Sequence, residues 1–282
     1  MRVVLATLVL NEMEWIGKLY EQHKSFPKML SWVFVEAADE IYRRANPSHV
    51  SNDGLSVDGT TEFLEQLQRE DDRVIHIKHG ITSHPTDPAQ GKIAARRNYF
   101  DVAAKINPDS VLVLDADEFY SHDHQWLIGD TWDRSNRGRS KMGFIFKQRH
   151  IWKPDLSPEP LFSQEVVGGY WDIPHTRLWT YTRGMNYTDN HNTPGNVRLM
   201  RMDQGKTERP QCIHMGFASS LIRRAAKHNY YIQRGEGVTD KRQMYVDCRA
   251  AFETWTPGTP LPHKARVISY HGPKPEAFSG KS

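Results

Sequence analysis

The first 120 residues alternate short, continuously apolar runs with segments whose apolar residues recur at helical spacing. The apolar runs have the length of strands and lie at residues 3–10, 32–35, 74–77 and 111–114. Strands that are apolar throughout are buried on both faces, which is typical of a parallel sheet covered by helices on both sides. Connections between such strands are right-handed, which restricts the topology further. The sequence therefore predicts an α/β chain with a nucleotide-binding type of parallel sheet.

The pattern changes after Phe119. Trp, Tyr, His, Pro and Gly become frequent, and the strand-like pieces, such as residues 143–146 and 177–181, are shorter. This pattern predicts a mixed sheet with long loops, which are the usual carriers of specificity. We expect one continuous domain, with a nucleotide-binding half at residues 1–120 and a second half at residues 121–282.

The bulk composition is that of a folded soluble protein, with 38% hydrophobic and 25% charged residues. No apolar run approaches the roughly 20 residues of a membrane helix, and the apolar stretch at residues 3–10 is not followed by a signal-peptide cleavage site. We therefore expect no integral membrane association and a cytoplasmic location. Cys212 and Cys248 are too few for a disulfide framework, so both are expected as reduced thiols.

The most informative segment for function is the fourth apolar run, which ends in Asp115, Ala116 and Asp117. Alternate side chains of an extended chain point the same way, so the two aspartates project together from the carboxyl end of the strand. Ligands of open α/β sheets bind outside those ends. Two adjacent carboxylates that both stay ionised usually hold a cation, and a hard divalent ion also takes phosphate oxygens. The segment predicts a Mg²⁺ or Mn²⁺ site that anchors a diphosphate.

Other classes also place Asp-x-Asp after a strand. In haloacid-dehalogenase-like phosphatases the motif follows the first strand, with Thr or Val two positions past the second Asp, whereas here that position is Phe119. A calcium-binding loop and the glycine-rich phosphate-binding motifs have no match in the sequence. A metal-dependent phosphatase or hydrolase and a non-catalytic carbohydrate- or nucleotide-binding module stay open as alternatives.

Five elements in order resemble the GT-A glycosyltransferases, especially the family 2-like group. They are Asn11-Glu12 after the first strand, Glu36 at the end of the second, the turn Asp58-Gly59-Thr60, the basic helix with Lys92, Arg96 and Arg97, and Asp115-Ala116-Asp117. The resemblance covers roughly the first 120 residues. It departs at residues 39–57, which are inserted between the second strand and its usual turn, and the polar, irregular part from residue 41 onward reads as a loop.

The resemblance implies an inverting, metal-dependent transfer of a hexose or pentose from a nucleoside-diphosphate sugar, most simply a UDP-sugar. The GT-A type fold it implies has a mostly parallel central sheet with flanking helices and a mixed-sheet second half. Residues 1–120 would bind the donor, and residues 121–282 the acceptor. The implied donor contacts are Asn11, Glu12, Glu36, Asp58, Lys92, Arg97 and Asp115.

Metal ligands implied by the resemblance are Asp115, Asp117 and His214. Residues 213–217 are similar to the segment that supplies a late histidine to the metal, and imidazole is an acceptable ligand for manganese. His271 is the rival for that role. We also expect Arg97 to share the apolar face of its helix with Ile93, Phe100 and Ala104.

The general base that activates the acceptor is expected in the second half, with Asp172, Asp189 and Glu165 as candidates. We favour Asp172, because a Gly-Gly-aromatic turn precedes it and can bring backbone close to a sugar. The acceptor is left open between a soluble glycan and a hydroxymethylated base in DNA. The second option draws on the sequence pI near 8.7 and on the basic residues 134–153.

Overall fold

The computed structural model describes residues 1–82, 88–135, 142–153, 161–168, 175–188, 193–195, 197–201, 210–234, 246, 250–251, 254–256, 261 and 265–279. Residues 1–113 contain four strands and four α-helices in the described ranges. They are β1 (Val3–Val9), α1 (Ile16–His23), β2 (Met29–Asp39), α2 (Glu40–Ala45), η1 (Pro47–His49), α3 (Thr60–Glu70), β3 (Val74–Thr82), α4 (Pro88–Ile106) and β4 (Ser110–Val113).

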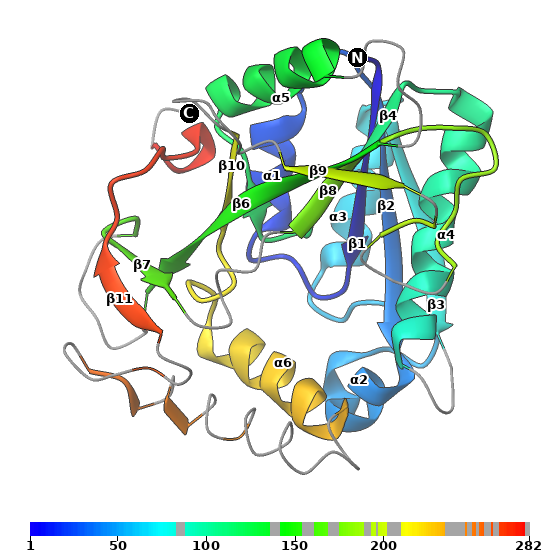
Figure 1. The fold of residues 1–282 in the computed structure, drawn as a ribbon. Coiled ribbons are helices and arrows are strands. Elements are labelled where there is room, and N and C mark those ends of the chain that lie inside the picture. The colour runs from blue at the N-terminus through cyan, green and yellow to red at the C-terminus, as the bar shows by residue number, and fades with distance from the viewer. Residues whose placement is uncertain are drawn as a thin grey trace.

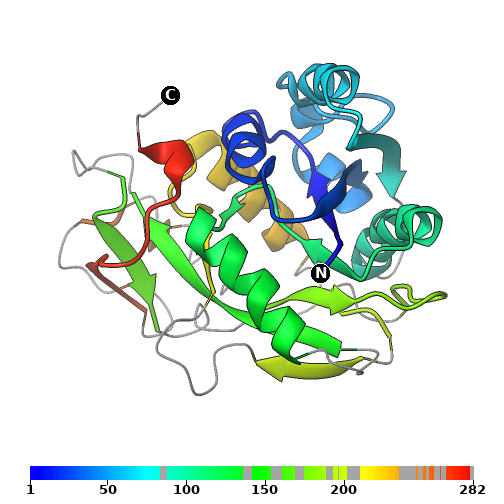
Figure 2. The same cartoon turned by 90° about the horizontal axis from the view of Figure 1, so that it is seen from above.

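The chain after residue 113 consists mainly of strands. In the described ranges it contains β5 (Glu118–Phe119), α5 (His122–Ser135), β6 (Met142–Trp152), β7 (Gln164–Val167), β8 (His175–Thr180), β9 (Arg198–Arg201), β10 (Gln211–His214), α6 (Leu221–Arg234), β11 (Arg266–Ser269) and η4 (Glu276–Phe278). Figure 2 shows the elements of the first half, in blue to cyan, on one side and most of the second half on the other.

The first-half strands pair in parallel in the order β3-β2-β1-β4. Successive β1 residues serve opposite faces, as the pleat requires. Val3 and Leu5 belong to the core that α1 and α3 cover, whereas Val4 and Ala6 belong to the core that α4 covers. The predicted α/β class, with a helix-covered parallel sheet, is therefore confirmed.

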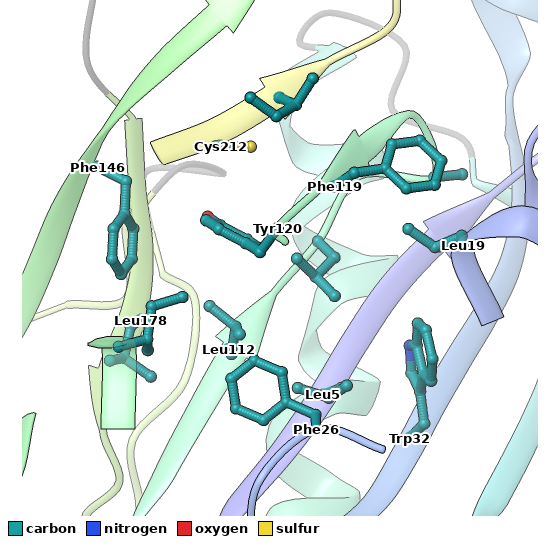
Figure 3. Packing of buried hydrophobic residues seen from close by; sticks show 14 of the residues in the cluster. Leu5, Leu19, Phe26, Trp32, Leu112, Phe119, Tyr120, Phe146, Leu178 and Cys212 are labelled. Atoms are coloured by element: carbon teal, nitrogen blue, oxygen red, sulfur yellow. The ribbon is translucent and has the colours of Figure 1, made fainter. Parts of the chain in front are cut away.

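Antiparallel pairing begins at β8, which continues the sheet from β4 to β6. Beyond it, β7 and β11 pair antiparallel, while β9 and β10 pair parallel with β6. The predicted mixed second half is thus also observed. Figure 3 shows how the two halves share a core, in which Leu112 and Tyr120 lie beside Phe146 and Leu178.

The inserted segment starts as a helix rather than as the loop expected from the sequence. The carboxylate of Asp39 caps α2 by accepting the Ile41 N–H at 2.8 Å, and Pro47 then begins the short η1. The Asn46 side chain donates to the Ala226 carbonyl of α6 at 2.9 Å. Local capping and this distant contact stabilise helix in a segment without apolar periodicity. Figure 1 shows α2 and α6 side by side, next to the arrowheads of β2 and β3.

No helix in the described parts of the chain is both long and apolar enough to cross a bilayer.

Candidate active site

The site lies at the carboxyl ends of β1 and β4, where the direction of the strand order reverses. From β1 the chain leads to β2 on one side, while β4 lies on the other side of β1, and this reversal opens a crevice at the carboxyl ends of the strands. A pocket of about 640 Å³ occupies the crevice, and α6 forms its opposite wall. Its charged and aromatic lining comprises Glu12, Glu14, Asp39, Tyr42, His49, Asp58, Lys92, Arg96, Asp115, Asp117, His214, Arg223, Lys227, Tyr230 and Tyr231.

Asp115 lies between two arginines. Its Oδ2 accepts from Arg177 of β8 at 2.7 Å, and its Oδ1 is 3.4 Å from the Arg96 guanidinium of α4. Burial alone would raise the pKa of this carboxyl, but the two guanidinium groups hold it well below its usual range. Asp115 is therefore ionised and already paired with protein cations.

Glu118 is a buried partner of this cluster that the sequence reading did not single out. Its side chain is fully buried, accepts from Arg177 and from Gln148, and also accepts the Asp115 backbone N–H at 3.2 Å. Burial raises the pKa of Glu118 to about 7. Because Glu118 bonds to both Arg177 and the backbone N–H of Asp115, it holds the Asp115-Ala116-Asp117 motif in place at the end of β4.

Asp117 faces the second half and α6. Its Oδ1 is 3.6 Å from His214 Nε2, and its Oδ2 is 3.5 Å from Arg223 and 3.9 Å from Lys227. Burial would raise the pKa of Asp117, but His214 and these two cations lower it to about 2. The structure thus brings together Asp117 and His214, which are about 100 residues apart in the chain.

Helix α6 is attached to the loop after β1. Arg223 lies 2.5 Å from the carboxylate of Glu12, and Glu14 accepts the Ser220 N–H at 2.9 Å at the start of α6. Burial raises the pKa of Glu12 to about 8. The spacing of four residues between Arg223 and Lys227 could have placed both on one face of a helix. Only the fold shows that this pattern faces the pocket.

The expected donor contacts divide into two groups. Asn11, Glu12, Asp58, Lys92 and Asp115 line the pocket, whereas Glu36 and Arg97 are not among its lining residues. The Glu36 carboxylate is fully buried and holds the inserted segment instead. It accepts from Ser56 N–H at 2.8 Å and from the Thr61 hydroxyl at 2.7 Å, and it lies 2.9 Å from His76 Nε2.

Arg97 points away from the pocket because the buried face of α4 differs from the expected one. Arg97 is exposed and donates to the Tyr187 carbonyl at 3.1 Å, and Ala104 is exposed as well. The adjacent Arg96 is 5% exposed and lines the pocket. Ile93 and Phe100 of the expected face are buried as predicted, but Arg97 and Ala104 are not, because α4 also packs on the sheet through Ala95, Tyr99 and Val102. A one-residue shift rotates a helical side chain by about 100°.

Among the candidate general bases, Glu165 is buried and bonded to Arg149, with oxygen–nitrogen distances of 2.5 Å, and it is not among the lining residues of the pocket. Asp172 and Asp189 lie outside the described residues. The rival histidine, His271, is exposed after β11 and is not in the pocket lining either.

The basic stretch 134–153 is only partly described. Arg134 pairs with Asp130 on α5, and Arg149 pairs with Glu165, so two of its cations are already neutralised within the protein. Phe144, Phe146 and Trp152 are buried in the core. None of these described side chains presents an aromatic or a free guanidinium to a nucleic acid.

The residues present are compatible with a divalent metal, provided that the substrate completes its coordination. In the described parts of the chain, no three His, Cys, Asp or Glu side chains converge closely enough to hold an ion by themselves. Asp117 and His214 offer two donor atoms 3.6 Å apart, and ligand distances of about 2.1 Å allow one ion to contact both. Magnesium-type sites often use one or two protein ligands plus substrate phosphates.

The pocket carries both signs of charge. Its lining holds six carboxylates and four Lys and Arg side chains, and Arg177, which is not among the lining residues, pairs with Asp115.

No protein-family model matches the chain, and no curated protein sequence matches it. Solved structures of S. aureus TarS are similar in fold. TarS 1-349 gives a TM-score of 0.42 at 11% identity, with 92% of this chain and 74% of that chain covered. Its complex with UDP-GlcNAc gives 0.38 at 10% identity, with 89% and 72% covered. Against a longer TarS chain the TM-score is 0.31 at 14% identity, and 57% of this chain spans 23% of that one. Such scores are too low to support a functional assignment.

Proposed function

We propose that this chain is a metal-dependent, inverting glycosyltransferase that uses a nucleoside-diphosphate sugar, with a UDP-sugar as the expected donor. One observation supports this proposal most directly. In the pocket at the carboxyl ends of the parallel strands, Asp117 lies 3.6 Å from His214 and 3.9 Å from Lys227. A volume of about 640 Å³ is within the usual range of small-ligand sites.

The donor diphosphate would lie between α4 and α6. Lys92 and Arg96 line the pocket from α4, and Arg223 and Lys227 line it from α6. Asp117 and His214 would hold a Mn²⁺ or Mg²⁺ ion, with Asp115 beside them as the ionised partner of Arg96 and Arg177. The ion, when bound, would supply charge neutralisation for the departing nucleoside diphosphate.

The protein side chains would support the same step. Lys92 and Lys227 would stabilise the charge that develops on the leaving oxygen, since preorganised cations act strongly in a pocket from which water is excluded. Inversion requires an acceptor hydroxyl on the far side of the anomeric carbon and a general base beside it. We propose Asp172 for the base, with Asp189 as the alternative.

The acceptor we propose is a hydroxyl group of a soluble glycan. Within residues 134–153, Arg134 and Arg149 pair with Asp130 and Glu165, and Phe144, Phe146 and Trp152 are buried, which argues against this stretch as a DNA-binding surface. Salt-dependent DNA binding with a steep slope would restore that option.

The first experiment is a thermal-shift and donor-hydrolysis screen of nucleotide sugars with and without Mn²⁺. It compares the wild type with Asp117→Ala, and the matched control is Asp130→Ala on the exposed part of α5. We expect Mn²⁺-dependent stabilisation or slow hydrolysis with one uridine sugar, retained in Asp130→Ala and lost in Asp117→Ala.

The alternatives give different results in the same screen. A phosphatase would hydrolyse a generic phosphate ester without any acceptor, and a binding module would bind a donor but leave it intact with every acceptor supplied. If no donor produces a response, and Asp117→Ala behaves like the wild type, the proposed function is wrong.

A further inference from the structure

The inserted residues 39–57 form one wall of the pocket. The lining includes Asp39 at the end of β2, Tyr42 of α2, Ser48 and His49 of η1, and Val57 ahead of α3. Segments that connect the regular elements beside a ligand pocket are the usual carriers of specificity. The insertion is therefore placed to contact part of whatever the pocket binds.

The pocket runs from Asp117 toward this wall. Asp117 and His214 line one end, and the carboxyl ends of β1, β2 and β3 supply further lining residues, among them Ala37 and Thr82. In the order β3-β2-β1-β4, β2 is two strands from β4, which is a distance of about 10 Å. In the described parts of the chain, the second half lines the pocket only through His214 and residues 220–231. A ligand whose diphosphate is held at Asp117 can therefore extend over β1 and β2, beside the insertion.

Tyr42 is the residue of the insertion best suited to contact a flat ligand. Its half-buried ring lies 5.9 Å from the Tyr230 ring of α6, at 54°. Its hydroxyl oxygen accepts a hydrogen bond from the Asn11 side chain. Helix α2 is fixed to α6, because the Asn46 amide donates to the Ala226 carbonyl at 2.9 Å. The ring is thus held in place before a ligand binds, which reduces the entropic cost of binding.

Asn11 attaches the insertion to the loop after β1. Its backbone lies in the left-handed region, with a φ of 55°, which asparagine adopts more readily than most residues. Its backbone N–H donates to the Ser56 hydroxyl at 3.0 Å and its amide donates to the His49 carbonyl at 2.6 Å. Its Oδ1 accepts the Val57 N–H at 2.9 Å. These three hydrogen bonds make the insertion a fixed wall of the pocket.

Glu36, which the family resemblance implies as a donor contact, is used inside the protein. Its Oε1 accepts from the Ser56 N–H and the Thr61 hydroxyl, and its Oε2 lies 2.9 Å from His76 Nε2. Glu36 is 0% exposed and is not among the lining residues of the pocket. A nucleoside bound near the end of β2 therefore needs another contact.

We infer that Tyr42 is the residue on which the base of the donor nucleoside stacks. The inference rests on the proposed function and gives to the insertion the role that Glu36 would have had. With the base at Tyr42, the diphosphate lies between α4 and α6, and the sugar lies on the side of β10. Aromatic stacking accepts any base, because every base has a π-face. Tyr42 thus supplies affinity for the nucleoside, and the lysines of α4 and α6 supply affinity for the diphosphate.

The test separates these two parts of the ligand by calorimetric titration with UDP and with inorganic pyrophosphate, both with Mg²⁺. Tyr42→Ala should weaken UDP binding about 5- to 100-fold, the range that corresponds to loss of one base–aromatic stack. Its affinity for pyrophosphate should equal that of the wild type. Tyr42→Phe keeps the ring, so it should bind UDP nearly as tightly as the wild type. The control Trp126→Ala removes an exposed aromatic side chain of α5 outside the pocket lining and should change neither affinity.

Photocrosslinking gives an independent readout in the unmodified protein. Irradiation of the complex with 5-iodo-UDP, followed by mass spectrometry of the digested chain, should find the nucleotide attached to the peptide that contains Tyr42. Excess UDP should prevent the attachment. Attachment only to peptides outside residues 39–57 would overturn the inference.

The titrations can also overturn it. UDP affinity in Tyr42→Ala equal to that of the wild type would do so, and so would an equal loss of UDP and pyrophosphate binding, which indicates damage to the whole pocket. Tyr42→Phe as weak as Tyr42→Ala toward UDP would assign the effect to the hydroxyl instead of the ring. A wild type that binds neither UDP nor pyrophosphate would instead overturn the proposed function, and the inference with it.

Discussion

Arg177 of β8 donates to Asp115 Oδ2 at 2.7 Å, so an arginine from the second half of the chain neutralises the first aspartate of a motif in the first half. The same NH2 group also bonds to Glu118. One buried cation thus serves the buried Glu118 carboxylate and the partly exposed Asp115 carboxylate, and the motif depends on a strand that follows it by about 60 residues.

Arg177→Met should destabilise the protein by about 3–5 kcal/mol, because it leaves the buried Glu118 carboxylate without its cation and leaves Asp115 with Arg96 alone. Urea unfolding at pH 7 measures the loss. Arg134→Met, which breaks an exposed pair with Asp130, should change the free energy of unfolding by no more than about 1 kcal/mol. Equal effects of the two substitutions would show that the buried cluster is not a major source of stability.

Glu36 should make stability depend on pH in the acid range. Burial would raise its pKa, but hydrogen bonds from His76, Ser56 and Thr61 outweigh burial and lower it from 4.5 to about 2. The folded pKa is depressed, so the contribution is fully present above about pH 4.5 and is lost as the pH falls toward 2. It amounts to about 3 kcal/mol.

Unfolding of Glu36→Gln and of the wild type should therefore be compared at pH 7 and pH 3. The difference in free energy of unfolding should shrink at the lower pH. A difference that is the same at both values would contradict the pKa assignment.

Gly216→Ala should disturb the His214 ring while leaving the fold intact. A Cβ at Gly216 would lie 2.3 Å from His214 Cε1, so the ring must leave its present position beside Asp117 Oδ1. We expect loss of Mn²⁺-dependent donor stabilisation in the thermal-shift assay. The matched control is Gly129→Ala in α5, where a Cβ meets no atom within 4 Å, and which should stabilise the helix by up to about 1 kcal/mol. Unchanged Mn²⁺ dependence in Gly216→Ala would argue against a role for His214.

Lys92→Gln should weaken UDP binding about tenfold, whereas Arg97→Gln should leave it nearly unchanged. Lys92 lines the pocket, with its ammonium 5.6 Å from the centre of the Tyr230 ring, and Arg97 is exposed outside it. A loss of one favourable charge contact with a phosphate corresponds to roughly 1.4 kcal/mol. Calorimetric titration with UDP tests both variants. A stronger effect of Arg97→Gln would mean that α4 turns when the donor binds.

Regular parts of the fold could be read from the sequence because they depend on local patterns. Continuous apolar runs located β1, β2, β3 and β4, and apolar periodicity located α1. The helix in the inserted segment was missed because its stability comes from the Asp39 cap and from the contact of Asn46 with α6. The positions of Arg97 and Ala104 on α4 were predicted incorrectly, because packing on the sheet, rather than spacing alone, decides which face of the helix is buried.

For the site, the sequence by itself determined that Asp115 and Asp117 leave a buried strand together at the carboxyl edge of a parallel sheet. This follows from strand periodicity and from the topology of such sheets. The tertiary structure decided which charged partners each aspartate meets, and only the pairing of Asp117 with His214 was implied beforehand, by the family resemblance. Arg177 comes to Asp115 through the antiparallel pairing of β8 with β4, and His214 and Lys227 come to Asp117 through β10 and α6. Contacts between residues 60 to 110 positions apart depend on how the strands pair, and no local pattern in the sequence encodes that pairing.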